Sequence, residues 1–229
     1  IGESSLAEKI EDWENELPEE IKLAYLPSPG KVKLRLSGSG FDKLALGKSI
    51  LQEIEGLQEI LGDLILGFED DYSIVESVAS LLKTKGDSLS VAESCTGGYL
   101  SSILTEKPGA SQFFIGGLVA YTEEIKIQEL KVSKSTIDEY SVVSVQVAEE
   151  MAIGIRNKTR SCYSIATTGN SGPTKDETDK EVGTVCIAIA TPSGVYSEEF
   201  NFGKPREKVI HRSSNKALEL LRKEIIKNY

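Results

Sequence analysis

Apolar residues recur with two different periods along the first 65 residues, which predicts a small α+β unit. Apolar positions at three- and four-residue steps indicate amphipathic helices, and the alternation of charged and apolar residues over Lys31–Leu36 indicates a strand with one buried face. A Pro-Ser-Pro-Gly turn at residues 27–30 separates two of the strands. The predicted elements are helices over Leu6–Leu17 and Lys43–Leu61 and strands over Ile21–Leu26, Lys31–Leu36 and Leu64–Leu66.

A domain boundary is expected near Asp70–Tyr72, so that residues 1–72 and 73–229 form separate domains. The second part alternates helical and strand patterns, which predicts a three-layer α/β/α domain with a mixed, mainly buried sheet. Ser144 is expected to cap a helix. The predicted helices are Ser73–Lys83, Gly97–Leu104, Glu123–Leu130, Ser144–Thr159 and Arg206–Ile226, and the strands are Ser88–Ala92, Phe113–Tyr121, Cys162–Thr167, Gly183–Ala190 and Gly194–Phe202.

Composition narrows the class of protein. The 229 residues are 39% hydrophobic and 27% charged, which is typical of an ordinary globular protein. A net charge of −10 argues against non-specific binding to nucleic acid or an anionic membrane. No apolar run is long enough to span a bilayer, and no signal peptide precedes the first helix. We therefore expect a cytoplasmic protein and, because the chain does not begin with Met, a fragment of a longer one.

The cysteine and histidine content limits the chemistry. The three cysteines form no pair or metal-ligand spacing, so we expect reduced thiols and no metal or cofactor. The single histidine, His211, lies inside the last predicted helix and is expected to be structural or solvent-facing.

The segment Ala92–Gly98 joins a buried strand to a helix. Free amides at such a turn can bind an oxyanion, and its two glycines allow close approach of a substrate. Ser94 is a candidate nucleophile, whereas the alternative interpretation gives Ser94 or Thr96 only a capping role. Cys95 is either a second candidate nucleophile or a small buried residue.

The predicted strands Phe113–Tyr121 and Cys162–Thr167 are each followed by a polar segment. We expect both segments at the same edge of the sheet as Ser94. Lys126 lies 32 residues after Ser94 and can act as a general base if burial keeps it neutral; otherwise it is a solvated surface lysine. Residues 167–173 form either a plain turn or a third wall of one pocket. Arg206 can hold a carboxylate or phosphate, or it is a surface arginine.

These segments, in this order, resemble the CinA family (competence/damage-inducible protein), specifically its C-terminal nicotinamide-nucleotide deamidase domain. The resemblance runs from about Ser73 to the end of the chain, and the first ~70 residues are similar to the family's KH-like module. The matching stretches are Ala92–Gly98, Pro108–Ser111, Gly116–Gly117 with Val119–Tyr121, Lys126, Val143–Ser144, Thr168–Gly169 with Gly172–Pro173, and Val182–Val185.

The resemblance implies hydrolysis of nicotinamide mononucleotide to nicotinate mononucleotide and ammonia, without metal or cofactor. It implies Ser94 as nucleophile and Lys126 as general base, with Tyr121 and Thr168 assisting. Residues implied to bind the substrate are Cys95, Thr96, Gly97, Gly98, Gly169 and Arg206. It further implies a small-molecule nucleotide as partner, no nucleic acid or membrane, a homo-oligomer (dimer or larger), and a molybdopterin-binding-like domain preceding this chain.

The chain departs from the family pattern at three places, and the altered loop among them, together with the fragmentary start, leaves a second hypothesis open. The loop 169–176 differs from the usual Gly-Ile-Ala-Gly-Pro run, Glu181 replaces a frequent proline, and Ile210 stands at a usually basic position. The KH-like module also lacks a Gly-x-x-Gly loop, so we expect no RNA clamping. The alternative is a catalytically silent nucleotide-binding or assembly module of a larger CinA protein.

Overall fold

The computed structural model describes residues 2–28, 31–65, 73–174 and 180–228. The chain divides into one unit of residues 1–69 and another of residues 70–229. The expected boundary at Asp70–Tyr72 lies outside the described residues, as does the end of the expected strand Leu64–Leu66.

The N-terminal unit packs two helices against a β-hairpin. Its core joins one face of the first helix (Leu6, Ile10 and Trp13) to Leu57 and Leu61 of the second. Leu64 is the last residue of a short 3₁₀ helix, Gly62–Leu64, so the prediction that a strand begins at Leu64 is wrong. The elements are α1 (Glu3–Asn15), β1 (Ile21–Ser28), β2 (Lys31–Gly38) and α2 (Lys43–Leu61), with β1 and β2 antiparallel.

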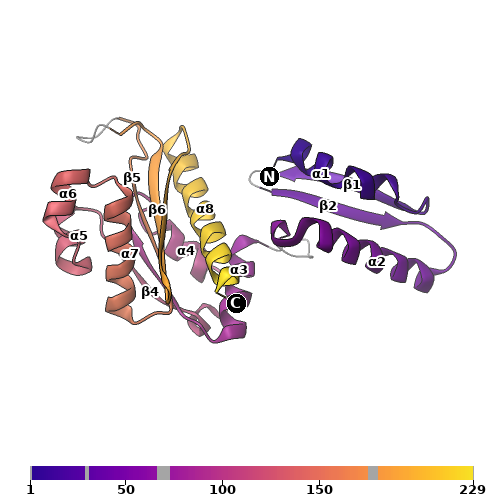
Figure 1. The fold of residues 1–229 in the computed structure, drawn as a ribbon, viewed down its shortest axis with the longest axis horizontal. Coiled ribbons are helices and arrows are strands. Elements are labelled where there is room, and N and C mark those ends of the chain that lie inside the picture. Colours follow the sequence, from indigo (N-terminus) through magenta and orange to yellow (C-terminus); the bar gives the residue numbers. More distant parts are fainter. Residues whose placement is uncertain (1, 29–30, 66–72, 175–179, 229) are drawn as a thin grey trace. The chain divides into compact units, whose positions relative to one another are not determined.

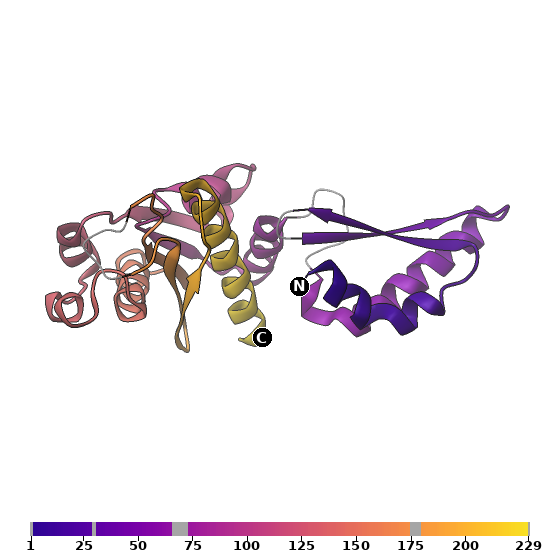
Figure 2. The ribbon, with the colours of Figure 1, turned by 90° about the horizontal axis from the view of Figure 1, so that it is seen from above.

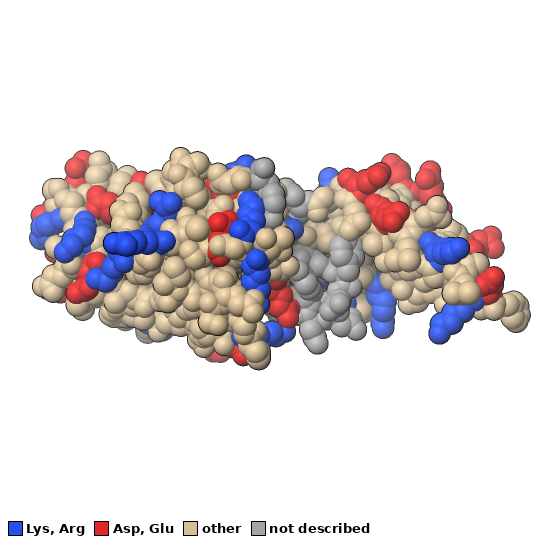
Figure 3. Space-filling model, turned by 90° about the horizontal axis from the view of Figure 1, so that it is seen from below, with Lys and Arg blue, Asp and Glu red and all other residues tan. Residues whose placement is uncertain are grey.

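The outer face of α1 is strongly acidic. Glu3, Glu8, Glu11 and Asp12 are exposed there, and Figure 3 shows Asp and Glu side chains gathered on one side of the N-terminal unit. Such a surface repels a phosphate backbone.

The C-terminal unit is built on a five-stranded mixed sheet in the order β4–β3–β5–β6–β7. The strand β3 runs parallel to β4 and to β5, whereas β6 and β7 are antiparallel to their neighbours. Since β3, β4 and β5 are parallel, their carboxyl ends meet at one edge of the sheet. The strands are β3 (Leu89–Glu93), β4 (Phe114–Val119), β5 (Tyr163–Gly169), β6 (Thr184–Thr191) and β7 (Gly194–Asn201).

Helices cover both faces of this sheet, which confirms the predicted α/β/α fold. Figure 1 shows α7 and α8 on opposite faces, and Figure 2 shows the same layers from above. Two apolar cores fill the spaces between the layers. One face carries α3 (Ile74–Lys85), α4 (Tyr99–Thr105) and α8 (Arg206–Lys227), and the other carries α5 (Glu123–Leu130), α6 (Lys134–Tyr140) and α7 (Val145–Thr159).

Local signals set most of these boundaries to within a few residues. Ser144 caps α7 as predicted, because its hydroxyl accepts the amide of Val147. The short helix α6 was not predicted, since its seven residues carry too little periodicity. Within the described ranges, no helix is both long and apolar enough to cross a membrane.

The helices α5 and α7 approach closely at Gly154. A Cβ atom built at this position overlaps the carbonyl oxygen of Leu130, the last residue of α5. The absence of a side chain at Gly154 therefore lets the C-terminal end of α5 lie against α7.

Replacing this glycine tests the approach. Gly154→Ala should destabilise the C-terminal unit by about 2 kcal/mol or more, because the obstacle is backbone that cannot rotate away. The matched control Gly47→Ala, inside α2, places its Cβ in open space and should be neutral or stabilising by up to about 1 kcal/mol. Thermal denaturation followed by circular dichroism measures both, and an unchanged Gly154→Ala transition would contradict the prediction.

Candidate functional site

Ser94 begins a turn at the edge where the parallel strands end. It follows Glu93, the last residue of the fully buried strand β3. Its amide donates to the carbonyl oxygen of Thr167 at 2.9 Å, which continues the pairing of β3 with β5 by one residue. The neighbouring strand therefore fixes the backbone of Ser94.

Lys126 reaches Ser94 from the helix α5. Its side chain is 2% exposed, and its Nζ lies 3.1 Å from the Oγ of Ser94. The same nitrogen donates to the carbonyl oxygens of Ala120 at 2.9 Å and Tyr121 at 3.2 Å. The interpretation of Lys126 as a solvated surface lysine is therefore wrong.

Burial changes the protonation of this lysine. Loss of solvation lowers the pKa of Lys126 from 10.5 to about 8, and the negative charge of Glu123 opposes that fall. A neutral amine has two N–H bonds and one lone pair. In the neutral form, N–H bonds directed at the carbonyls of Ala120 and Tyr121 leave the lone pair for Ser94, whereas the charged amine donates to all three oxygens.

The thiol of Cys95 is also buried beside the dyad. Burial raises the pKa of this thiol to about 12, so it stays protonated near neutral pH. A protonated thiol is a poor nucleophile, which favours the interpretation of Cys95 as a small buried residue.

The turn between Ser94 and α4 is not held by a capping serine or threonine. The N-cap of α4 is Gly98, whose backbone is in the left-handed region and which has no side chain to cap the helix. The hydroxyl of Thr96 instead donates to Glu93 at 2.7 Å and lies 2.8 Å from the hydroxyl of Thr167. Sequence reasoning missed Glu93, although a carboxylate at the end of an apolar strand was a usable signal.

The side-chain hydroxyls of Tyr121 and Thr168, which were expected to assist catalysis, make no recorded contact with Ser94 or Lys126. Tyr121 contributes its carbonyl oxygen to Lys126, while its side chain is 56% exposed. The hydroxyl of Thr168 is buried and donates to the carbonyl oxygen of Val142 at 2.8 Å. Catalytic roles for these two hydroxyls stay predictions.

The loop after β5 lies beside the nucleophile turn. The hydroxyl of Ser171 donates to the carbonyl oxygen of Cys95 at 3.3 Å. Gly169 fits tightly, since a Cβ there would lie 2.6 Å from the carbonyl oxygen of Thr184. The Oδ1 of Asn170 accepts the amide of Gly172 at 2.9 Å, which stabilises the loop's bend. This loop therefore contacts the turn at Cys95, the residue after Ser94.

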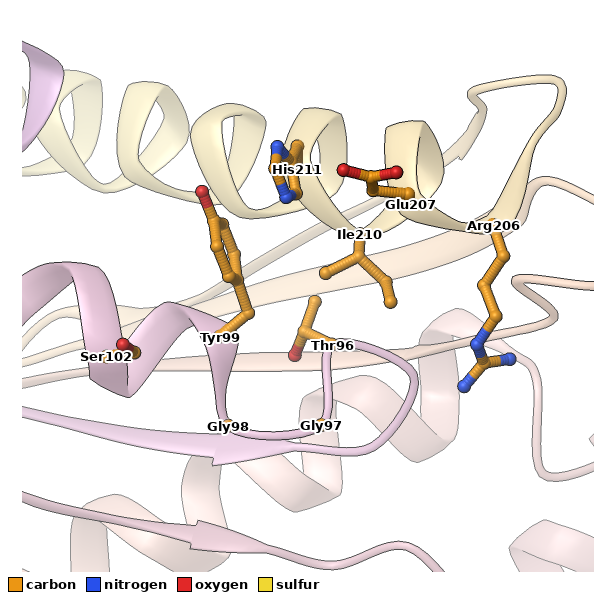
Figure 4. Close-up of a pocket in the computed structure, with 9 residues that line it drawn as sticks. All are labelled: Thr96, Gly97, Gly98, Tyr99, Ser102, Arg206, Glu207, Ile210 and His211. Atoms are coloured by element: carbon orange, nitrogen blue, oxygen red, sulfur yellow. The ribbon is translucent and has the colours of Figure 1, made fainter.

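A pocket of about 700 Å³ opens on the α4 and α8 side of the turn (Figure 4). Its rings, Tyr99 and His211, stack with centroids 4.4 Å apart, so His211 forms part of the wall. Arg206 donates to the carbonyl oxygen of Gly172 at 2.9 Å and thus holds the loop after β5. The lining residues are Thr96, Gly97, Gly98, Tyr99, Ser102, Arg206, Glu207, Ile210 and His211.

The part of the chain that the structure describes contains no cluster of three His, Cys, Asp or Glu side chains able to hold a metal ion.

Comparison with known proteins places both units in one family. Residues 71–225 match the CinA C-terminal domain, and residues 1–67 match the KH domain of the damage-inducible protein CinA. A CinA-like protein of Flavobacterium psychrophilum is 53% identical over all of this chain and 55% of its own length. The nicotinamide-nucleotide amidohydrolase PncC of Shewanella oneidensis is 38% identical over 98% of this chain and 52% of its own length. The chain thus spans about half the length of these relatives.

Solved structures agree with this assignment. The competence or damage-inducible protein of Enterobacter asburiae superimposes with a TM-score of 0.64 at 31% identity, covering 67% of this chain and 98% of that one. The competence/damage-inducible protein of Agrobacterium tumefaciens gives a TM-score of 0.61 at 34% identity, covering 65% of this chain and 94% of that one. The chain therefore belongs to the CinA family and consists of a CinA KH domain followed by a CinA C-terminal domain.

Proposed function

We propose that this chain hydrolyses the carboxamide of nicotinamide mononucleotide, releasing ammonia and nicotinate mononucleotide, with Ser94 as nucleophile and Lys126 as general base. The observation that carries the proposal is the buried amine of Lys126, 3.1 Å from the Oγ of Ser94. The name of the Shewanella relative supports the choice of substrate.

The dyad accounts for both proton transfers of an amide hydrolysis. Neutral Lys126 takes the hydroxyl proton as the Oγ of Ser94 attacks the carboxamide carbon. The resulting ammonium of Lys126 then protonates the amide nitrogen, the C–N bond breaks, and ammonia leaves an acyl ester on Ser94. Water attacks that ester while Lys126 accepts its proton, and the proton returns to Ser94 as nicotinate mononucleotide departs.

The negative oxygen of the tetrahedral intermediate needs hydrogen-bond donors. In the turn, the amide of Gly97 donates to the carbonyl oxygen of Ser94 and the amide of Gly98 donates to Glu93. Among the described contacts, the amide of Thr96 has no acceptor, and the amide of Cys95 meets only its own thiol. We therefore assign these two amides as the oxyanion donors.

The pocket beside the turn is large enough for the ribose phosphate of a nucleotide. Arg206 reaches it from the start of α8, and its guanidinium can bind a phosphate while one nitrogen holds the carbonyl of Gly172. Ile210, which stands where the family pattern is usually basic, lines the same pocket, so Arg206 carries the larger share of phosphate binding here.

Ammonia release from nicotinamide mononucleotide tests the dyad. Ser94→Ala and Lys126→Met should each lower kcat by about 10⁴-fold or more, because each removes a group that takes part in every bond change. Cys95→Ala keeps its backbone amide and should retain turnover, and the surface control Lys158→Met should match the wild type. A wild type that releases no ammonia would favour the catalytically silent module, and loss confined to Cys95→Ala would replace the serine assignment.

The pH dependence tests the protonation state. The base is active when neutral, so kcat/KM should rise with pH through about 8, the pKa of Lys126, when measured from pH 6 to 9.5. Glu123→Gln should move the midpoint to lower pH, because the charge of Glu123 raises the pKa of Lys126. A midpoint that does not respond to Glu123→Gln would argue that another group titrates.

A third measurement separates two roles of Arg206. If Arg206 binds phosphate, Arg206→Gln should raise KM for nicotinamide mononucleotide by about tenfold or more, while turnover of nicotinamide riboside changes little. If Arg206 only holds the loop at Gly172, both substrates should slow to the same extent. Steady-state kinetics with the two substrates decides between these outcomes.

A further inference from the structure

Glu93 is a fully buried carboxylate directly before the nucleophile, and every recorded partner is a donor. Its side chain has 0% exposure. The Oε1 accepts the amide of Ser101 at 2.8 Å and its hydroxyl at 2.6 Å. The Oε2 accepts the hydroxyl of Thr96 at 2.7 Å and the amides of Gly98 and Leu100, each at 3.0 Å. This donor set matches an ionised carboxylate, which accepts at both oxygens.

These bonds fix the turn from its buried side. Thr96 and Gly98 are held two and four residues after the nucleophile, and Thr96 also lies 2.8 Å from Thr167 on β5. Ser94 is held at its own amide by the carbonyl of Thr167. The turn is therefore tied to the sheet at three successive points, and its direction relative to Lys126 is determined.

The same carboxylate decides which amides remain available. It takes the amides of Gly98, Leu100 and Ser101 at the start of α4, so these donors do not face a substrate. In the described part of the chain, the amide of Thr96 keeps no acceptor and that of Cys95 meets only its own thiol. Glu93 thus separates donors that stabilise the turn from donors that can meet an oxyanion.

We propose that Glu93 is a positioning residue of the hydrolase site: its buried carboxylate holds the turn so that Ser94 meets Lys126 and the amides of Cys95 and Thr96 face the developing oxyanion. This inference rests on the proposed serine mechanism but not on the identity of the substrate. Replacing Glu93 with glutamine tests it, because an amide group has one acceptor oxygen and turns an N–H₂ donor toward amides that can only donate.

The experiment measures the reactivity of Ser94 without a substrate. Wild type and Glu93→Gln react with a fluorophosphonate, and intact-protein mass spectrometry follows the modification, with Ser94→Ala as the blank. Glu93→Gln should slow modification by about 10²-fold, the cost of misplacing oxyanion donors. Glu76→Gln is the matched control, because Glu76 also accepts an amide at a helix start, that of Ser73, but in α3, and its modification rate should equal the wild type.

Turnover adds readouts that a merely structural role would not produce. With nicotinamide mononucleotide, Glu93→Gln should lower kcat by a similar factor and leave KM within about threefold. The pH midpoint should stay near that of the wild type, because burial and the charge of Glu123 set the pKa of Lys126 and Glu93 is not among its causes.

A second pair of variants keeps the test decisive if Glu93→Gln does not fold. Thr96→Val removes the hydroxyl that links Glu93 to Thr167 and should slow modification about tenfold. Thr96→Ser restores the hydroxyl and should restore the rate. Equal rates for Thr96→Val and wild type would overturn the proposal.

The remaining outcomes separate this inference from the proposed function. A wild type that reacts with fluorophosphonate but releases no ammonia would overturn the substrate, while slow modification of Glu93→Gln would still support the role of Glu93. A folded Glu93→Gln that reacts as fast as wild type would overturn the role of Glu93. A wild type that reacts no faster than Ser94→Ala would overturn it too, because no activated serine would exist to be positioned.

Discussion

The site depends on one contact, the approach of the Lys126 Nζ to the Ser94 Oγ at 3.1 Å. The two residues come from different elements, and they meet because β3 and β4 run parallel and end at the same edge of the sheet. The approach of α5 to α7 at Gly154 holds the helix that carries the lysine. The packing that hides Lys126 also favours its neutral amine, which the proposed mechanism requires of a base.

Two ionisable side chains, Lys126 and Glu93, are buried close to Ser94, but their surroundings differ. Among the described residues, Lys126 has no carboxylate in direct contact, so loss of solvation disfavours its charged form. Glu93 is equally hidden but accepts five hydrogen bonds, which replace the lost water. Burial thus shifts Lys126 toward its neutral form, whereas the hydrogen bonds of Glu93 hold the backbone of the turn.

The departures from the family pattern lie around the reacting atoms rather than on them. The changed loop after β5 still contacts the nucleophile turn through Ser171, and Arg206 fastens it at Gly172. Ile210 adds an apolar surface to the pocket that Arg206 shares. These departures leave the contact between Ser94 and Lys126 unchanged, because it involves none of these residues. They alter the surroundings in which a substrate would be held.

The sequence by itself determined the layered α/β/α fold and nearly all element boundaries, because hydrophobic periodicity, caps and turn residues are local signals. It also placed Ser94, Lys126 and the loop after β5 at strand ends, but the residues alone left a capping serine and a surface lysine as alternatives. Only the tertiary structure decided between them, since burial and a contact across 32 residues depend on how distant segments pack. For the same reason the sequence alone did not predict the role of Glu93, because its hydrogen-bond partners, which extend to Ser101, are defined only by the tertiary structure.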